Sequence, residues 1–246
     1  MKIIPLSEGS FTIDKTKVLV PFDEEKDSLK QRPVGSLLVE IQPFVVITQT
    51  DTLLIDTGLG WVKDGEMQLI KNLKANGIAP DSITKVLLSH VHKDHAGGVS
   101  QKDRLGNYRV SLPEATWFLQ RREFDYAMET GYPSYSTDEF ELLDGYSKVY
   151  WLDDDEGTID NYIRYQVTGA HSPFHQVFWI EENGDIIFFG GDDAPQLNQM
   201  MSRFVAKYDY DGKKCMELRQ QWWEQAKKES WTFLFYHDSK HGVVKA

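Results

Sequence analysis

All seven histidines of this 246-residue chain lie in three short segments, and each segment follows a stretch that is typical of a β-strand. Sites in open α/β sheets gather at the C-terminal ends of strands. We therefore expect the three segments to contribute to one shared site. The histidines are His90, His92, His95, His171, His175, His237 and His241.

The first segment has the spacing of a metal-binding loop. In extended chain, residues two apart point to the same side, so His90 and His92 can bind one cation. The chain must then turn before a pair of glycines, which brings Asp94 and His95 to a second position. Imidazole and carboxylate groups are ligands for divalent transition metals. The segment therefore predicts a metal site, and this one loop can serve two metals.

A site with two metals needs about three protein ligands for each metal and a shared carboxylate. His171, His237 and Asp192 would complete such a set. Asp192 follows a predicted apolar strand and two glycines, which let the backbone approach the site closely. Taken singly, Asp192, His175 and His241 are equally well explained as hydrogen-bonded structural groups.

Composition argues against several classes of function. The chain has 38 acidic and 27 basic residues, a formal net charge of −11 and a pI near 5.1, which disfavours nucleic-acid binding. Its single cysteine, Cys215, excludes an internal disulfide and a cysteine-rich zinc site. No segment has the roughly 20 apolar residues that span a bilayer, and the N-terminus lacks a signal-peptide pattern. These features predict a cytoplasmic protein with no membrane or nucleic-acid partner.

The hydrophobic pattern alternates between strands and helices along the chain. Strand patterns occupy residues 34–41, 44–48, 53–55, 83–88, 162–167, 176–180, 186–189 and 231–236. Helical patterns occupy residues 65–75 and 213–229. The mixture predicts a layered α/β fold, and the absence of linkers and repeats predicts a single domain over residues 1–246.

These motifs resemble those of the metallo-β-lactamase superfamily of metal-dependent hydrolases. Five motifs of the family occur in the expected order over most of the chain. They are residues 54–58 (Leu-Ile-Asp-Thr-Gly), 90–98, 169–175, 191–192 and His237. The resemblance implies a four-layer αββα sandwich made of two related halves, with the site at one edge of the packed sheets.

The resemblance also implies a set of ligands for two divalent cations, with zinc expected and iron or manganese as alternatives. One metal would be held by His90, His92 and His171. The other would be held by Asp94, His95 and His237. Asp192 would bridge both metals, and Asp56 would support the ligands from behind.

Particular positions separate the branches of this superfamily. Zinc β-lactamases usually have a cysteine where this chain has Asp192, which argues against antibiotic hydrolysis. The chain resembles the branch of N-acyl homoserine lactonases, glyoxalase II enzymes and organophosphate hydrolases. It departs from their pattern twice: Pro-Phe-His at 173–175 replaces Pro-Gly-His, and Pro195 replaces a tyrosine common in the lactonases. Tyr208 and Tyr210 are candidates to replace that tyrosine.

We therefore expect a dinuclear metal-dependent hydrolase in which a metal-bridging hydroxide cleaves a carboxylic ester or lactone. Two cations about 3.5–4 Å apart bring the pKa of a bridging water near 7. Asp94 is the expected catalytic proton shuttle. The net negative charge disfavours polyanionic substrates, and Trp61 is expected in the pocket wall, where it would contact an apolar group. We therefore expect a neutral or apolar small-molecule substrate. Two alternatives stay open: a diiron redox or oxygen-sensing protein, and a phosphotriesterase or phosphodiesterase.

Overall fold

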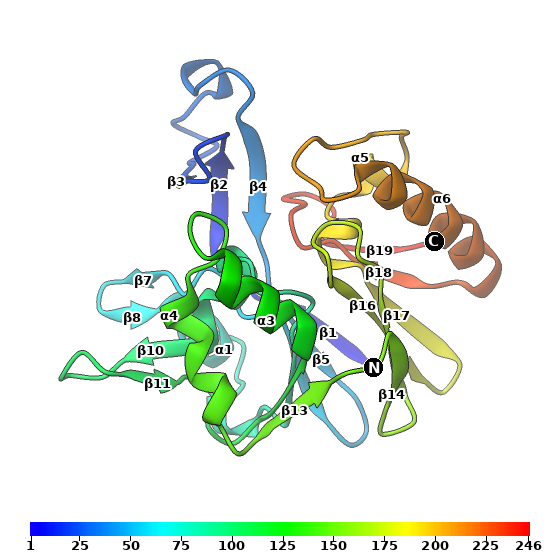
Figure 1. Ribbon diagram of the computed structural model, residues 1–246. Helices are drawn as coiled ribbons and strands as arrows, with labels where there is room; N and C mark the ends of the chain where they lie inside the picture. Colours follow the sequence, from blue (N-terminus) through cyan, green and yellow to red (C-terminus); the bar gives the residue numbers. More distant parts are fainter.

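The computed structural model describes residues 1–246 and contains two six-stranded mixed sheets packed face to face, with helices on their outer faces (Figure 1). The first sheet has the order β1 (Lys2–Pro5), β5 (Phe44–Ile47), β6 (Thr52–Ile55), β9 (Lys85–Leu87), β12 (Thr116–Gln120) and β13 (Val149–Leu152). The second has the order β14 (Glu156–Ile159), β15 (Ile163–Val167), β16 (Gln176–Glu182), β17 (Asp185–Phe189), β18 (Thr232–Leu234) and β19 (Val243–Lys245). The αββα architecture expected from the sequence is confirmed.

The remaining elements cover the sheets or extend from them. The α-helices are α1 (Gln68–Ala75), α2 (Lys93–Ala96), α3 (Arg121–Thr130), α4 (Thr137–Phe140), α5 (Leu197–Met200) and α6 (Gly212–Glu229). The small sheets are β3 (Leu19–Pro21) with β2 (Gly9–Ile13) and β4 (Leu37–Ile41), β7 (Val62–Lys63) with β8 (Glu66–Met67), and β10 (Ser100–Lys102) with β11 (Tyr108–Val110). Short 3-10 helices occupy Leu29–Gln31, Pro80–Ser82, Gly97–Val99, Glu141–Gly145 and Gly191–Asp193. None of the helices combines the length and apolar character needed to span a bilayer.

Three apolar layers hold the sandwich together. On β5, Phe44 and Val46 face the second sheet, whereas Val45 faces the helices that cover the first sheet. Successive side chains of a strand point to opposite faces, and here both faces are covered, so the strand is apolar throughout. The third layer lies between the second sheet and α6, where Trp222 packs against Phe188.

Strand direction explains why the polar motifs meet. β6 and β9 are parallel neighbours, so their C-terminal ends lie at the same edge of the first sheet. In the second sheet β17 and β18 are parallel, and β15 points the same way because two antiparallel pairings separate it from β17. The residues that follow these five strands therefore gather at one edge of the sandwich.

Two of the expected element boundaries are wrong by three residues, and the others differ by two residues at most. The strand expected at 34–41 begins at Leu37, because residues 33–36 form a turn in which the Ser36 N–H donates to the Pro33 carbonyl. Val34 is fully exposed in this turn. The helix expected from residue 65 begins at Gln68, because the residues before it pair as β8.

Glu8 is a buried carboxyl group beneath the loop that follows β6. Its Oε2 accepts a hydrogen bond of 2.8 Å from the Leu59 N–H, while its Oε1 is buried without a partner. Burial raises the pKa of Glu8 to about 8. A Cβ at Gly58, whose φ is +79°, would lie 2.7 Å from this carboxyl group, so glycine permits the contact. Glu8 is therefore protonated at neutral pH and acts as a neutral hydrogen-bonding group.

This raised pKa predicts how stability depends on pH. Folded Glu8 holds its proton more tightly than the unfolded chain does, so its contribution is complete below pH 4.5 and disappears by about pH 8. We expect Glu8→Gln to remove up to roughly 4–5 kcal/mol of this dependence, at about 1.36 kcal/mol per pKa unit. Urea unfolding at pH 5 and pH 9 measures it, with the exposed Glu25→Gln as control. An equal stability difference between wild type and variant at both pH values would contradict the prediction.

Candidate active site

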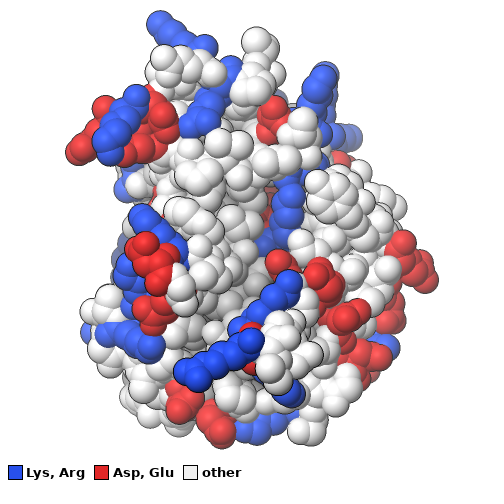
Figure 2. Space-filling view, turned by 90° about the vertical axis from the view of Figure 1, so that its left-hand side faces the viewer, with Lys and Arg blue, Asp and Glu red and all other residues white.

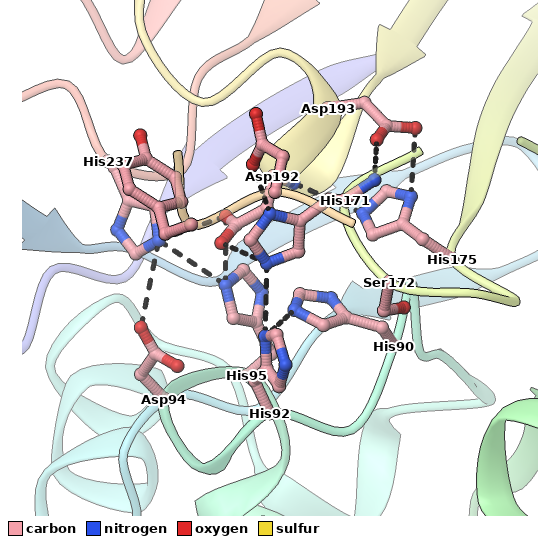
Figure 3. A network of polar contacts seen from close by, with 12 residues as sticks. His90, His92, Asp94, His95, His171, Ser172, His175, Asp192, Asp193 and His237 are labelled. Carbon is pink, nitrogen blue, oxygen red and sulfur yellow. Dashed lines mark hydrogen bonds and ion pairs between the residues drawn. The ribbon is translucent and has the colours of Figure 1, made fainter. Parts of the chain in front are cut away.

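The seven predicted ligand residues lie together at the edge where the strand ends meet, and Figure 3 shows their side chains pointing into one centre. Their nitrogen and oxygen atoms form two groups, within each of which they lie no more than 4.8 Å apart. The first group is His90, His92, His171 and Asp192. The second is Asp94, His95 and His237. The loops after β9, β15, β17 and β18, together with α2, position all of them.

Asp192 stands between the two groups. Its Oδ2 lies 3.1 Å from His171 Nε2. Its Oδ1 lies 3.1 Å from His95 Nε2 and 3.0 Å from His237 Nε2. Asp94 approaches the same nitrogen of His237, with 3.7 Å between Asp94 Oδ2 and His237 Nε2. One carboxylate therefore faces both groups of ligands, as a bridging ligand must.

Asp56 orients two of the imidazoles from behind. Its Oδ2 is 2.7 Å from His95 Nδ1 and also accepts a 2.7 Å hydrogen bond from the Ser89 hydroxyl. The Ser89 oxygen in turn lies 3.0 Å from His90 Nδ1. A neutral imidazole has one N–H, and these partners place it on Nδ1. In the neutral rings, the Nε2 atoms of His90 and His95 therefore carry the lone pairs that face the centre.

His171 and His237 are oriented in the same way by other parts of the chain. His171 Nδ1 lies 2.8 Å from Asp209 Oδ1, and His237 Nδ1 lies 2.7 Å from the backbone carbonyl oxygen of Glu40. Both partners are acceptors, so the neutral form of each ring carries its proton on Nδ1 and leaves Nε2 free to bind a cation. Partners of this kind fix the ring orientation and raise the basicity of metal-binding histidines.

The electrostatics of the centre call for positive charge. Burial opposes ionisation of Asp192, but His237, His95 and His171 outweigh it and hold the pKa of Asp192 well below its usual range. Burial likewise disfavours an imidazolium at these three histidines. The Asp192 carboxylate outweighs this effect and raises the pKa of each. Without a cation, protons must therefore supply the positive charge around Asp192.

The donor set fits a pair of divalent cations. Burial and the neighbouring imidazoles hold the pKa of His90 and His92 well below the ordinary value, so these rings are neutral donors. The nitrogen atoms that face the centre are only 2.9 Å apart between His90 and His92, and 3.0 Å between His92 and His171. Asp192 Oδ1 is buried without a hydrogen bond. Neutral imidazoles and carboxylates in this arrangement are typical ligands of zinc, iron and manganese.

His175 and His241 lie outside both groups. His175 is buried, with its Nδ1 3.1 Å from Asp193 Oδ2, and its Nε2 accepts a 3.2 Å hydrogen bond from the Asp192 N–H. A Cβ at Gly191 would lie 2.6 Å from His175 Nε2, so glycine allows this approach. His175 therefore positions the backbone of Asp192. The His241 side chain is 56% exposed.

Sequence reasoning missed the supporting groups Asp209, Asp193 and Ser89. Asp209 lies in a stretch without periodicity before α6, and no motif marks it. Its side chain is only 2% exposed, because the segment folds back against His171. Ser89 adjoins His90 and Asp193 adjoins Asp192, so the place of each beside a motif could have indicated these two supporting groups.

A cavity of about 490 Å³ opens on the two ligand groups. Its apolar wall comes from the end of β2, from β4 and from the loop after β17. These residues are Ile13, Leu37, Leu38, Val39 and Pro195. Tyr208 lines the cavity, whereas Tyr210 lies outside it and is 70% exposed. Of the two tyrosines considered from the sequence, only Tyr208 can reach a bound molecule.

The expectation that Trp61 lines the pocket is wrong. Its ring packs edge-on against Phe11, with 5.4 Å between ring centroids, and joins the edge of the core between the sheets. Trp61 is absent from the cavity lining because its side chain packs against the core instead. The apolar wall therefore belongs to an extension that the motifs did not mark.

A family model described as the metallo-beta-lactamase superfamily matches residues 39–235. The chain belongs to the metallo-beta-lactamase superfamily. The match includes six of the seven residues of the two ligand groups, and His237 lies two residues beyond its end.

Two curated proteins are related in sequence to this metallo-beta-lactamase superfamily member. The N-acyl homoserine lactonase AttM of Agrobacterium fabrum is 27% identical over 129 residues, which cover 48% of this chain and 44% of that protein. The atrochrysone carboxyl ACP thioesterase of Passalora fulva is 30% identical over 157 residues, which cover 64% and 38%. The chain thus spans less than half the length of these relatives.

Solved structures share the fold over nearly the whole chain. A probable metal-dependent hydrolase from Staphylococcus aureus superposes with a TM-score of 0.80 at 22% identity, covering 99% of this chain and 91% of that one. The dizinc quorum-quenching lactonase AidC superposes with a TM-score of 0.74 at 18% identity, covering 98% and 88%. At these identities the likeness establishes the metallo-beta-lactamase fold.

Proposed function

We propose that this protein is a metal-dependent hydrolase that binds two divalent cations and cleaves a carboxylic ester or lactone. The observation that carries the proposal is the Asp192 carboxylate, which faces two groups of oriented ligands at once. Two bound cations would supply a water of lowered pKa and would polarise the scissile carbonyl group. The lactonase and thioesterase among the relatives support the substrate class.

In the proposed reaction Asp94 moves the proton. Its side chain is half-buried and lines the cavity beside His237. The Tyr236 hydroxyl donates a 2.6 Å hydrogen bond to the Asp94 backbone carbonyl, which fixes the first turn of α2. Asp94 can therefore accept a proton from the attacking water and pass it to the departing alkoxide.

In the proposed reaction Tyr208 donates a hydrogen bond to the carbonyl oxygen of the substrate. It lines the cavity, and its ring centroid lies 6.2 Å from that of His171. Burial and the neighbouring Asp209 raise the pKa of Tyr208 to about 12, so its hydroxyl stays protonated and can donate a hydrogen bond. A donor aimed at the oxyanion stabilises the transition state more than the bound substrate.

The test combines metal analysis with a panel of an acyl homoserine lactone, an aryl ester, a thioester, a phosphotriester and a phosphodiester. We expect two metals per chain, and hydrolysis of esters or lactones that chelation abolishes and added metal restores. In the same assay Tyr208→Phe should lower kcat by about tenfold or more, since it removes an oxyanion donor. Tyr210→Phe, outside the cavity, is the matched control.

Three results would contradict the proposal. The first is full activity in protein freed of metal. The second is a phosphodiester as the best substrate. The third is a coloured, oxygen-sensitive centre without esterase activity, which would instead support a diiron redox protein.

A further inference from the structure

Four lysines line the cavity that opens on the ligand groups: Lys15, Lys17, Lys93 and Lys207. None of them forms an ion pair. The lysines that do so are Lys26, Lys74, Lys85, Lys148, Lys213 and Lys227. The chain has an excess of eleven acidic residues. Four unpaired ammonium groups at one cavity therefore give this part of the surface a charge opposite in sign to that of the whole chain.

The carboxylates of the cavity do not neutralise these lysines. Three carboxylates line it, and two of them, Asp94 and Asp192, belong to the ligand groups. The third, Asp14, accepts hydrogen bonds from the N–H and the hydroxyl of Thr16 in its own turn. Beyond the ligand groups, four positive charges therefore face one negative charge. In Figure 2, blue side chains gather beside a hollow near the middle of the face, with red atoms visible within it.

Two of the lysines stand close to the reacting end of the cavity. Lys93 lies between His92 and Asp94 in the chain, and its ammonium group donates to the backbone carbonyl of Lys17. This contact ties the turn after β2 to the start of α2. The Lys17 ammonium lies 6.0 Å from the centroid of the Tyr208 ring. Two of the four ammonium groups therefore lie close to Asp94 and Tyr208, the residues proposed to act at the scissile bond.

We propose that the cavity selects esters or lactones that carry a second, anionic group, a carboxylate or a phosphate monoester, away from the scissile bond. This inference rests on the proposed hydrolase function and names its substrate class. The ammonium groups bind the anion, and the wall formed by Leu37, Leu38 and Val39 contacts the apolar part between anion and ester. The sequence led us to expect a neutral substrate because the net charge of the chain is strongly negative. A bound molecule, however, interacts mainly with the charges that line the cavity, and these are mostly positive.

The experiment uses three aryl esters with the same acyl chain, ended by a carboxamide, a carboxylate or a phosphate monoester. The metal-loaded enzyme is assayed at low salt, and each kcat/KM is divided by the spontaneous rate of hydrolysis. We expect at least one anionic ester to exceed the neutral one by about tenfold, and added salt to reduce this ratio because it screens surface charges. The anionic ester with the higher corrected kcat/KM shows whether the cavity prefers a carboxylate or a phosphate monoester.

Lysine variants test whether the lysines of the cavity cause the preference for anionic esters. Lys17→Gln and Lys207→Gln should each lower the ratio of anionic to neutral ester by roughly three- to tenfold, the effect of one charge at close range. Lys71→Gln removes the same charge from an exposed position on α1 and should leave the ratio unchanged. Equilibrium binding of the corresponding amides to metal-free protein gives a second readout, independent of turnover.

The outcomes separate this inference from the proposed function. If the neutral ester is hydrolysed as well as both anionic ones, and the lysine variants leave the ratio unchanged, the inference is overturned while the hydrolase function stands. If the metal-loaded protein hydrolyses none of the three, the proposed function fails, and the inference fails with it. An anionic preference that Lys17→Gln reduces and Lys71→Gln does not supports the inference.

Discussion

Replacing Asp192 with alanine should remove metal from both ligand groups and lower kcat/KM by at least about a thousandfold. Its two oxygens lie about 3 Å from histidines of different groups, so one substitution weakens both proposed sites. Loss of the cations removes Lewis-acid stabilisation worth several kcal/mol, and about 4 kcal/mol corresponds to a factor of a thousand.

Metal content per chain and kcat/KM for an ester measure this effect. His92→Ala changes a ligand of one group only, so it should lose less metal than Asp192→Ala. Asp153→Ala, in the exposed loop between β13 and β14, removes the same carboxylate from a position outside the cavity and should change neither quantity. An Asp192→Ala protein that keeps two metals and its activity would exclude Asp192 as a bridging ligand.

Asp94→Asn should keep most of the metal and lower kcat by about 10²–10⁴-fold, the range typical of general acid–base catalysis. The amide keeps an oxygen that can face the cation but cannot accept the proton of the attacking water. The penalty should be larger for an alkyl ester than for a nitrophenyl ester, because an alkoxide must be protonated as it departs, whereas a nitrophenolate leaves without a proton.

The comparison with His237→Ala separates proton transfer from metal binding. His237 belongs to the same ligand group as Asp94 and has no proton to move in the proposed reaction, so its removal should lower metal content and activity together. Asp94→Asn should lower activity alone. If both variants lose metal and activity in equal proportion, Asp94 acts only as a ligand.

Much of the fold and the ligand positions could be predicted from sequence because they depend on local patterns. The apolar strands before His90 and Asp192 show which residues follow a strand end, and the two-residue spacing of His90 and His92 places both on one side of the chain. Parallel strands bring their C-terminal ends to one edge of a sheet, so such motifs converge without knowledge of any long-range contact. The alternation of strands and helices predicts a layered α/β fold, and the resemblance of the motifs to the metallo-β-lactamase superfamily implies the αββα order of the layers.

What surrounds the ligands was decided by tertiary structure. Asp209 and the carbonyl of Glu40 orient His171 and His237 across 38 and 197 residues of chain, and no local pattern marks such pairs. The sequence indicated Trp61 as a pocket wall, but the β2–β4 extension occupies that place.

The charge of the cavity shows most clearly the difference between what the sequence determines and what the tertiary structure determines. Composition determines the net charge of −11, and from it a uniformly acidic molecule would be expected. Lys17, Lys93 and Lys207 come from three distant segments that share no motif, and only the folded chain places them at one opening. Electrostatic interactions depend on distances in space rather than along the chain, so the sequence determined which charges are present and the fold decided which of them a substrate meets.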